Sequence, residues 1–316
     1  MTTARPWRIY FVSPAVKAAT GGVRTLYAHA TALREAGFDA VVVQTRADYR
    51  PRWFEPTVPI VGLDGASPQP HDVVVVPEDH AAGLAWARRQ AARRLVFCQN
   101  HFFAAAILDE ATDWMRDGFG VLCASEAVRA FLARHYGWRD LPVVPCAVDG
   151  SLFRPRAKER LIVFMPRKRP VEASMIRLLF RRRFPRHADV AFEPIEGMSE
   201  AETAERLGRA EIFLALGRFE GFGLPPLEAM AADALVVGFH GEGGREYATA
   251  ENGIWFDEGA VEPCIDALGA ICDRVKAGDP TVPAMRAAGR ATVARYSIAA
   301  RDAALLRFWH TMAPAG

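Results

Sequence analysis

Two glutamates, Glu220 and Glu228, stand eight positions apart in the segment GRFEGFGLPPLEAM at residues 217–230. Gly221 and Gly223 lie between them and let the backbone approach a ligand closely. The two prolines that follow suit the first turn of a helix, whose free N–H groups can bind a diphosphate. An ionised carboxylate accepts hydrogen bonds only, so each glutamate suits a vicinal diol. The spacing fits a nucleotide sugar, with one carboxylate for the ribose and one for the hexose.

The same segment also has a purely structural interpretation. We expect Glu228 in the opening turn of the helix, where the helix dipole favours the ionised carboxylate. We expect Glu220 in the preceding loop. Glu228 would then cap its own helix, as carboxylates at helix starts often do, and Glu220 would face water. These residues alone leave both interpretations open.

The surrounding chain alternates short apolar runs with helical patterns. The runs are apolar on both faces, as expected of parallel strands buried under helices. A helix with apolar residues at helical spacing is predicted over 21–36, and Gly37 supplies its C-terminal stop. Such alternation predicts doubly wound α/β sheets. The expected strands are 8–12, 40–45, 72–77, 94–99, 121–125, 161–165, 189–192, 211–216 and 234–239.

The alternation pauses at residues 148–160, which are polar, charged and interrupted by Pro155. We therefore predict two Rossmann-like domains, 1–152 and 153–295. The remaining residues, 296–316, contain an amphipathic helix that could pack on either domain, and we expect it on the first.

Composition limits the class of protein. The 316 residues are 51% hydrophobic and 24% charged, which is typical of a soluble globular protein. A formal net charge of +2 gives no reason to expect a nucleic-acid partner. We expect no signal peptide, no membrane span and a cytoplasmic location. The five cysteines, an odd number without CxxC spacing, are expected to be buried free thiols.

The segment EGFGLPPLE resembles the hallmark of retaining GT-B glycosyltransferases of the large family 4, in which seven residues separate two glutamates. The resemblance covers nearly the whole chain and implies the GT-B fold, with an N-terminal acceptor-side domain, a C-terminal nucleotide-sugar domain and the donor in the cleft between them. The other matching segments are GGV at 21–23, DVVVVPEDHAAGLA at 72–85, LVFCQNHF at 95–102, VLCASEAVRAFLARHYG at 121–137, VVPCAVDGSLFRP at 143–155 and GEGGREYATAENG at 241–253.

The resemblance also implies roles for the paired-acid segment. Glu228 would hold the ribose hydroxyls, and Glu220 would act at the donor hexose as a catalytic residue. Backbone amides around Phe222, Gly223 and Leu224 would face the sugar or the diphosphate.

Cations for the diphosphate are expected after the first strand of the second domain. The family has an Arg and a Lys about five residues apart, whereas this chain has Arg167, Lys168 and Arg169 in succession and Glu172 where the second cation would fall. Arg167 is the firmer match, and either Lys168 or Arg169 would complete the pair. Such cations stabilise the charge that develops on a leaving diphosphate. A solvated basic turn is the alternative.

Further candidates lie at the ends of other strands, where open α/β sheets bind ligands. The resemblance implies that His101 contacts the donor sugar and that Gly22 lies near the distal phosphate. Glu78 and His80 occupy an earlier strand end, and Glu246 in GGREY could touch donor or acceptor. A lone histidine or a glycine pair is also common in purely structural roles. Asp233 replaces the small residue of many relatives, and no functional role is assigned to it.

The implied activity is metal-independent transfer of a hexose, with retention, from a nucleotide-diphosphate sugar to a carbohydrate or lipid-linked acceptor. A front-face path would need no side-chain nucleophile and no cofactor. The chain lacks Asp-x-Asp and metal-ligand spacing, and it lacks the G-x-G-x-x-G of hydride-transfer enzymes. Three alternatives stay open: an epimerase of the same fold, a phosphorylase with a pyridoxal cofactor, and a non-catalytic binding subunit.

Two arginine-rich clusters, at 88–94 and 177–187, suggest a possible partner. With Phe180 and Phe184 nearby, the second could contact anionic lipid, which would hold the protein at the inner face of the membrane. Solvated helix ends explain the same residues.

Overall fold

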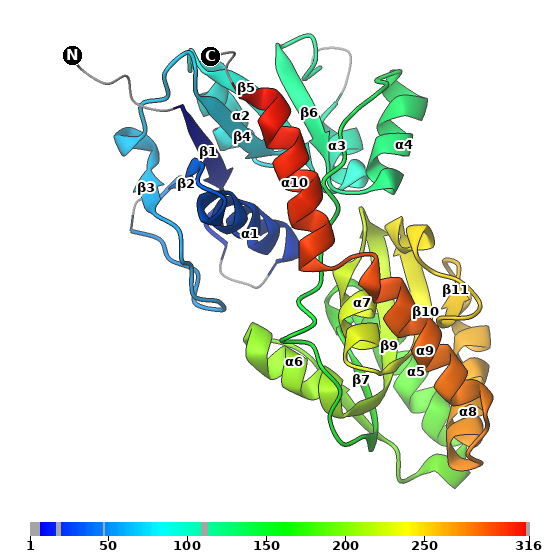
Figure 1. Ribbon diagram of the computed structural model, residues 1–316. Coiled ribbons are helices and arrows are strands. Elements are labelled where there is room, and N and C mark those ends of the chain that lie inside the picture. Colours follow the sequence, from blue (N-terminus) through cyan, green and yellow to red (C-terminus); the bar gives the residue numbers. More distant parts are fainter. Residues whose placement is uncertain (1–6, 17–19, 47, 109–112, 314–316) are drawn as a thin grey trace. The chain divides into compact units, whose positions relative to one another are not determined.

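A computed structural model describes residues 7–16, 20–46, 48–108 and 113–313 of the chain. It divides into two compact units (Figure 1). The first comprises Met1–Cys146 with Ala299–Gly316, and the second comprises Ala147–Ile298. The sequence predicted the boundary within 148–160, close to the observed change of unit after Cys146.

The first unit contains a parallel sheet in the order β3-β2-β1-β4-β5-β6. Alternate residues of the central strand β1 explain the layers, since Tyr10 and Val12 pack with α2, α3 and α4 on one face. Phe11 points to the other face, where it contacts Trp309 of α10 and His29 of α1. The strands are β1 (Arg8–Ser13), β2 (Asp39–Gln44), β3 (Ile60–Gly62), β4 (Val73–Pro77), β5 (Arg93–Cys98) and β6 (Phe119–Cys123). The helices are α1 (Gly21–Glu35), α2 (Ala81–Arg88), α3 (His101–Ile107), α4 (Glu126–Tyr136) and α10 (Ile298–Met312), with the 3₁₀ turn η1 (Leu63–Gly65).

The second unit contains a parallel sheet in the order β11-β10-β9-β7-β8. Helices α5 and α8 cover one face, and α6, α7 and α9 contact the sheet from the other side (Figure 1). The strands are β7 (Glu159–Phe164), β8 (Ala191–Pro194), β9 (Ala210–Glu220), β10 (Leu235–Glu242) and β11 (Ile254–Phe256). The helices are α5 (Pro170–Arg183), α6 (Glu200–Arg209), α7 (Leu224–Ala231), α8 (Val261–Lys276) and α9 (Thr281–Ala294), with 3₁₀ turns η2 (Pro166–Lys168), η3 (Pro185–His187) and η4 (Gly243–Glu246).

These elements confirm the prediction of two doubly wound parallel sheets. The predicted strands all form, because their apolar residues are buried on both faces; Val73, Val74, Val75 and Val76 of β4 are completely buried. The sequence did not predict β3 or β11, which are edge strands of three residues each. The predicted stop of the first helix is confirmed, since α1 ends at Glu35 and Gly37 adopts φ +89°.

Asp233, to which the sequence assigned no role, closes α7 in the left-handed conformation at φ +62°. Its carboxylate pairs with Arg286 at 3.1 Å and also with Arg290, both on α9. Asp233 therefore joins the end of α7 to α9, which holds the helix that carries Glu228.

The arginine-rich segment 177–187 corrects one expectation. Phe180 and Phe184 are buried in the core of the second unit, so neither ring can contact lipid. Arg183 and Arg186 form ion pairs with acids of α8. The five cysteines are buried free thiols, as predicted. Among the residues described, no helix has the length and apolar character required to span a bilayer.

Candidate active site at the carboxyl edge of the second sheet

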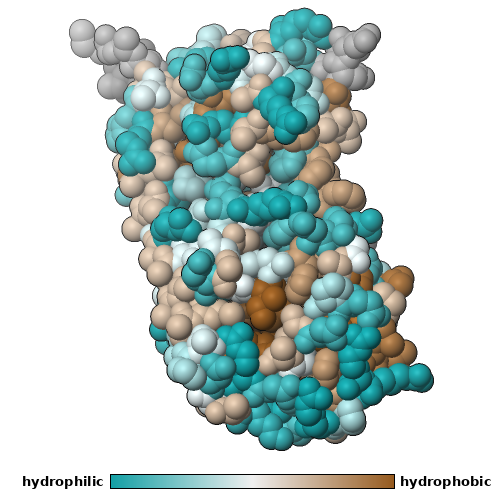
Figure 2. Space-filling model, turned by 90° about the vertical axis from the view of Figure 1, so that its right-hand side faces the viewer, coloured by the Kyte–Doolittle hydropathy of each residue, from teal (hydrophilic) through white to brown (hydrophobic). Residues whose placement is uncertain are grey.

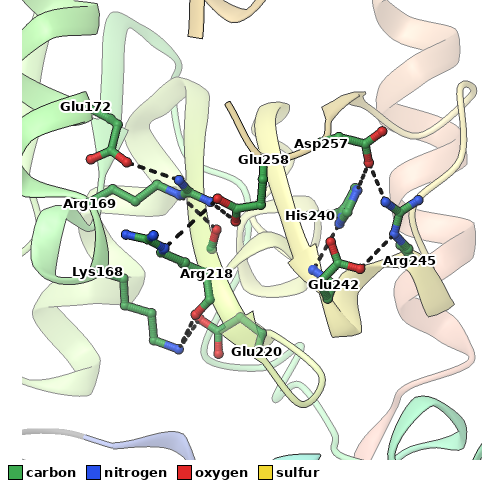
Figure 3. A network of polar contacts seen from close by, with 11 residues as sticks. Lys168, Arg169, Glu172, Arg218, Glu220, His240, Glu242, Arg245, Asp257 and Glu258 are labelled. Atoms are coloured by element: carbon green, nitrogen blue, oxygen red, sulfur yellow. Dashed lines mark hydrogen bonds and ion pairs between the residues drawn. The ribbon is translucent and has the colours of Figure 1, made fainter. Parts of the chain in front are cut away.

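Charged side chains gather where β7, β9, β10 and β11 end (Figure 3). Parallel strands end at one edge of a sheet, so residues far apart in sequence meet there. One group contains Lys168, Glu220 and their neighbours, and a second contains His240, Asp257 and theirs.

Glu220 is the last residue of β9, not a loop residue as predicted. The strand continues past the apolar run because β10 stays paired with it as far as Glu242, opposite Glu220. The Glu220 carboxylate accepts from Lys168 Nζ at 2.8 Å, and Lys168 Nζ also donates to the carbonyl of Arg218 at 3.1 Å. Both side chains keep about a quarter of their surface exposed, 24% for Lys168 and 23% for Glu220. The pair is therefore fixed in place and accessible to a ligand.

Arg169 is committed to the structure of the second unit. Its side chain is only 2% exposed, and its Nε donates to the carbonyl of Gly217 at 3.0 Å. The guanidinium lies 4.4 Å from the ring centroid of Phe239 and pairs with Glu172 and Glu258. Every donor group of this buried arginine is thus directed to the protein, which leaves Lys168 as the candidate for the diphosphate.

Arg167 lies in η2 with an exposed side chain. Within the described part of the chain it makes no hydrogen bond or ion pair. Lys168, one residue later, is the cation that the structure brings to Glu220. Arg167 remains a candidate as an uncommitted charge beside the pair.

The end of β9 and the turn after β10 pack against each other so closely that only glycine fits at two positions. A Cβ on Gly243 would lie 2.5 Å from the carbonyl oxygen of Glu220, and one on Gly241 would lie 2.9 Å from Glu220 Cγ. Gly241 also adopts φ +65°, a conformation that side chains disfavour. The turn after β10 therefore presses directly on Glu220 and limits where its side chain can go.

Gly223 starts α7 in the left-handed conformation at φ +88°. Tyr247, which is buried, donates its hydroxyl proton to the carbonyl of Gly223 at 2.5 Å and so fixes this turn. Phe222 is buried edge-to-face against Tyr247 and Tyr296. Its side chain therefore supports the turn from the core, and only backbone groups of Phe222, Gly223 and Leu224 are candidates for ligand contact.

Glu228 is the fifth residue of α7, in its second turn rather than in the opening turn as predicted. Burial raises the pKa of its carboxyl to about 8, and the nearby charge of Glu200 adds to the rise. The raised pKa is opposite to the effect of a helix dipole, and the expectation of a dipole-stabilised anion in the opening turn was wrong.

The Glu228 carboxyl has no protein partner. No hydrogen bond or ion pair reaches it from any residue that the structure describes. The residue is partly exposed, so a ligand or water can reach the carboxyl where no protein group does. Glu228 is therefore not a helix cap, and it has the free hydrogen-bonding capacity that a ligand hydroxyl would use.

Glu246 ends η4 with a partly exposed side chain. Burial raises the pKa of the Tyr247 hydroxyl well above its usual value, and the charges of Glu220, Glu228 and Glu246 add to this rise. The structure thus brings all three predicted acids of this unit around one buried tyrosine. The sequence did not single out Tyr247, although its place directly after GGRE was a signal that could have found it.

The first unit holds the remaining candidates, Gly22 and His101, at the carboxyl edge of its own sheet. A Cβ on Gly22 of α1 would lie 3.3 Å from the side-chain nitrogen of Gln99, so the start of α1 is close to the end of β5. His101, the first residue of α3, is buried with its ring 4.3 Å from that of Phe102 and 4.7 Å from that of Phe131.

Glu78 has a structural role, and His80 packs near it in the same strand-end turn. The buried Glu78 carboxyl accepts from the backbone N–H groups of Gln99 at 3.0 Å and Asn100 at 2.8 Å. Burial raises its pKa to about 8. The His80 ring packs against Gly83, where a Cβ would lie 2.6 Å away, and burial lowers its pKa. Through these two hydrogen bonds Glu78 holds the turn after β5, and this turn leads directly to His101.

The two doubly wound parallel-sheet units are those of the GT-B fold. Residues 192–274, about a quarter of the chain, match the family model described as glycosyl transferases group 1. This segment includes most of β8 and all of β9, α7 and β10. It contains Glu220, the partner of Lys168, and the acids Glu228 and Glu246.

A curated relative and several solved structures agree with this assignment. The α-1,6-glucosyltransferase of Actinobacillus pleuropneumoniae serotype 7 (strain AP76) is 34% identical over 92 residues, which are 28% of this chain and 28% of that protein. A glycosyltransferase from Rickettsia africae ESF-5 superposes with TM-score 0.72 at 13% identity, covering 99% of this chain and 100% of that one. Anabaena Alr3699/HepE, solved with UDP and glucose, gives TM-score 0.69 at 12% identity, covering 96% and 100%. These structural similarities establish the fold.

Proposed function

We propose that the protein transfers a hexose from a nucleotide-diphosphate sugar to a hydroxyl acceptor, with retention of the anomeric configuration. The observation that carries the proposal is the pairing of two unlike acids in the family-matched segment. Glu220 is held by Lys168, whereas Glu228 has a raised pKa and no partner among the described residues. Structural relatives have been solved with UDP and a sugar, namely HepE with UDP-glucose and the pneumococcal GtfA with UDP and GlcNAc.

In this proposal Glu228 accepts hydrogen bonds from the ribose hydroxyls, and Glu220 orients the donor hexose. Lys168 has two functions, since it fixes Glu220 and also supplies positive charge for the departing diphosphate. Arg167 can swing toward the same charge because no described residue holds it. The departing phosphate oxygen takes the proton of the acceptor hydroxyl, so the reaction needs no side-chain nucleophile. Catalysis is then electrostatic and positional.

A thermal-shift panel of UDP-glucose, UDP-GlcNAc and GDP-mannose tests donor binding, because a ligand of the folded state raises the melting temperature. Transfer is then measured with and without acceptors, and the product's anomeric configuration is read by NMR. Retained configuration in an acceptor-dependent product supports the proposal. An epimerised donor formed without acceptor, or binding with no turnover on any acceptor, would contradict it.

Metal independence is part of the proposal. Throughout the described ranges, no three His, Cys, Asp or Glu side chains are grouped so that they could hold a metal ion. The proposed charge stabilisation comes from Lys168, Arg167 and the turn amides. We expect turnover in excess EDTA to equal turnover without it, and a loss restored by added Mg²⁺ or Mn²⁺ would refute this part.

A second feature favours contact with anionic membrane lipid. Helix α5 exposes Val171, Met175 and Leu178, which are 73%, 39% and 54% exposed and lie one turn apart along one side. Arg177 and Arg182 flank this stripe, exposed and without a partner in the described chain. We propose that this cationic apolar face binds acidic headgroups and places the enzyme at a membrane surface.

Co-sedimentation measures this contact. Vesicles of phosphatidylglycerol and phosphatidylcholine should retain the protein at low salt, whereas pure phosphatidylcholine should not. Leu178→Glu should abolish the retention, and Glu251→Gln, on another surface of the same unit, should leave it unchanged. Equal binding to both vesicle types would refute the proposal.

A further inference from the structure

A large cavity of the second unit lies beside the edge strand β11. It has a volume of about 1080 Å³ and is bordered by the turn 248–253, β11, the end of α8 and the first half of α9. Figure 2 views the side on which β11 and α8 lie in Figure 1, and it shows a hollow with hydrophobic residues at its floor and hydrophilic residues around it. Its volume is at the upper end of the range for ligand sites.

The floor of the groove is apolar and partly aromatic. Trp255 and Phe256 of β11 line it together with Met285 of α9. The Trp255 ring is held in place because its Nε1 donates to Asn252 Oδ1 at 3.0 Å and its edge packs against Tyr247. Such a rigid aromatic surface can bind the C–H face of a sugar ring.

At one end of the groove the polar groups are fixed before any ligand arrives. His240 Nδ1 accepts from the backbone N–H of Glu242 at 3.0 Å, so its Nε2 carries the proton that is donated to Asp257 at 2.9 Å. This bond, together with the charge of Arg245, lowers the pKa of Asp257. The Asp257 carboxylate, held by His240 and Arg245 (Figure 3), nevertheless remains 71% exposed, so it presents an oriented, ionised group to the groove.

At the other end, Arg274 donates from Nε to Thr281 Oγ1 at 3.1 Å. The lining also contains Glu251, so two guanidinium groups, Arg245 and Arg274, are balanced by two carboxylates, Asp257 and Glu251. This balance favours neither an anionic nor a cationic ligand.

We infer that this groove is an accessory binding site for a neutral oligosaccharide. Sugar hydroxyls both donate and accept, so they match a rim where carboxylates and guanidinium groups alternate. The aromatic floor and the volume of about 1080 Å³ suit several sugar units rather than one. The inference extends the proposed function by giving the enzyme a place to hold a glycan chain, but binding itself requires no transfer.

The groove also adjoins the candidate active site. Arg245 pairs with both Asp257 and Glu242, and Glu242 lies opposite Glu220 in the ladder of β9 and β10. A glycan in the groove would therefore have one end next to the turn that presses on Glu220.

Isothermal titration of the full chain with maltopentaose, cellopentaose and isomaltopentaose tests the inference. At least one should bind, and Asp257→Asn together with Arg274→Ala should weaken it at least fivefold. Arg154→Ala, an exposed arginine of the same unit, is the matched control and should bind as the wild type does. If the double variant does not fold, Glu251→Gln replaces it and should weaken binding at least twofold.

Three results would overturn the inference: no binding of any neutral pentasaccharide at millimolar concentration, equal binding by wild type and groove variants, or tighter binding of a heparin-derived pentasaccharide than of every neutral one. Glu220→Gln separates this inference from the proposed function, because it should slow transfer about 10²–10³-fold and leave the oligosaccharide affinity unchanged. Failure to transfer with intact binding would count against the function alone.

Discussion

A buried or partly buried acid lies at the carboxyl edge of each sheet, and the two acids differ in their hydrogen-bond partners. In the first unit, both oxygens of Glu78 are occupied by backbone N–H groups at 2.8 and 3.0 Å. In the second, the carboxyl of Glu228 meets no partner among the described residues. Burial raises both pKa values to about 8. A raised pKa therefore does not distinguish a structural acid from a ligand-binding one; the presence or absence of a partner does.

A second contrast lies within the active-site edge itself. Glu220 has a cation at 2.8 Å, whereas Glu228 has no protein partner among the described residues and a pKa raised to about 8. The two acids of the motif thus have different environments, as expected if one acts at the reacting sugar and the other holds the ribose. The experiments below separate these roles and the contrast with Glu78.

The largest effect is expected from Glu220→Gln, which keeps the shape of the side chain and removes its charge. Loss of a preorganised charged group at a reacting centre costs about 10²–10³-fold in kcat. The melting temperature should change little, because the partly exposed pair with Lys168 contributes about 1 kcal/mol or less. Steady-state kinetics and a thermal melt measure both. A kcat within threefold of the wild type would remove Glu220 from catalysis.

Glu228→Gln should act on donor binding. A hydrogen bond to a charged group contributes roughly 1.5–3 kcal/mol, so the Kd for the nucleotide sugar should rise about 10- to 100-fold with a smaller change in kcat. The carboxylate accepts both ribose hydroxyls only when it is ionised. The wild-type Kd should therefore fall as pH rises from 7 to 9, through the pKa of about 8. The variant should lose this dependence, and calorimetry across the pH range decides.

The same substitution should affect stability in the opposite sense. The folded-state pKa of about 8 lies above the ordinary value of 4.5, so the folded protein retains a proton that the unfolded chain releases. Wild-type stability should fall as pH rises from about 4.5 to 8 through this group. Glu228→Gln should therefore melt higher than the wild type at pH 8, and the advantage should disappear near pH 4.5. A variant that is less stable at pH 8 would indicate a missed structural partner.

The sequence predicted the parts of this picture that depend on local pattern. Buried β-branched runs gave the two sheets, and the EGFGLPPLE segment gave the acid pair and the helix start at Pro225 and Pro226. The burial of Glu228 could not be predicted, because it depends on packing from elements outside the segment. Whether Lys168 or Arg169 is available to the diphosphate also depends on tertiary contacts. Arg169 donates to the carbonyl of Gly217 and packs on the ring of Phe239.

The groove was unpredictable for a related reason. Its floor strand, β11, has three residues, too few to show an alternating pattern. Its polar rim combines side chains from β10, η4, β11, α8 and α9 that no sequence motif links. Only the fold places His240, Asp257 and Arg274 along one surface.

Glu78→Gln tests the first-unit side of the comparison. The glutamine would turn an N–H group toward one of the two backbone donors, so a buried N–H would lose its acceptor at a cost of about 1–3 kcal/mol. For a chain of this size this is roughly 2–4 °C in melting temperature per kcal/mol. A thermal melt at pH 7 measures the loss. If donor binding were lost instead, with stability intact, the assigned contrast between Glu78 and Glu228 would be reversed.

The smallest effect is expected from Tyr247→Phe, which removes one buried hydroxyl. That hydroxyl donates to the carbonyl of Gly223, at the left-handed turn from which α7 carries Glu228. Loss of the bond costs about 1 kcal/mol and lets the turn move. We expect kcat/KM to fall about three- to tenfold, mainly through KM. A shifted turn would place the two acids less well for donor binding, while each carboxyl group itself is unchanged.

Tyr136→Phe is the matched control, since within the described chain no hydrogen bond of the Tyr136 hydroxyl is present. It should leave KM unchanged. A purely structural Tyr247 would lower the melting temperature of the variant and leave the KM of the folded enzyme at the wild-type value. A rise in KM measured well below the melting temperature therefore identifies Tyr247 as a positioning residue. At that temperature nearly all molecules are folded, so weaker donor binding must come from a displaced turn.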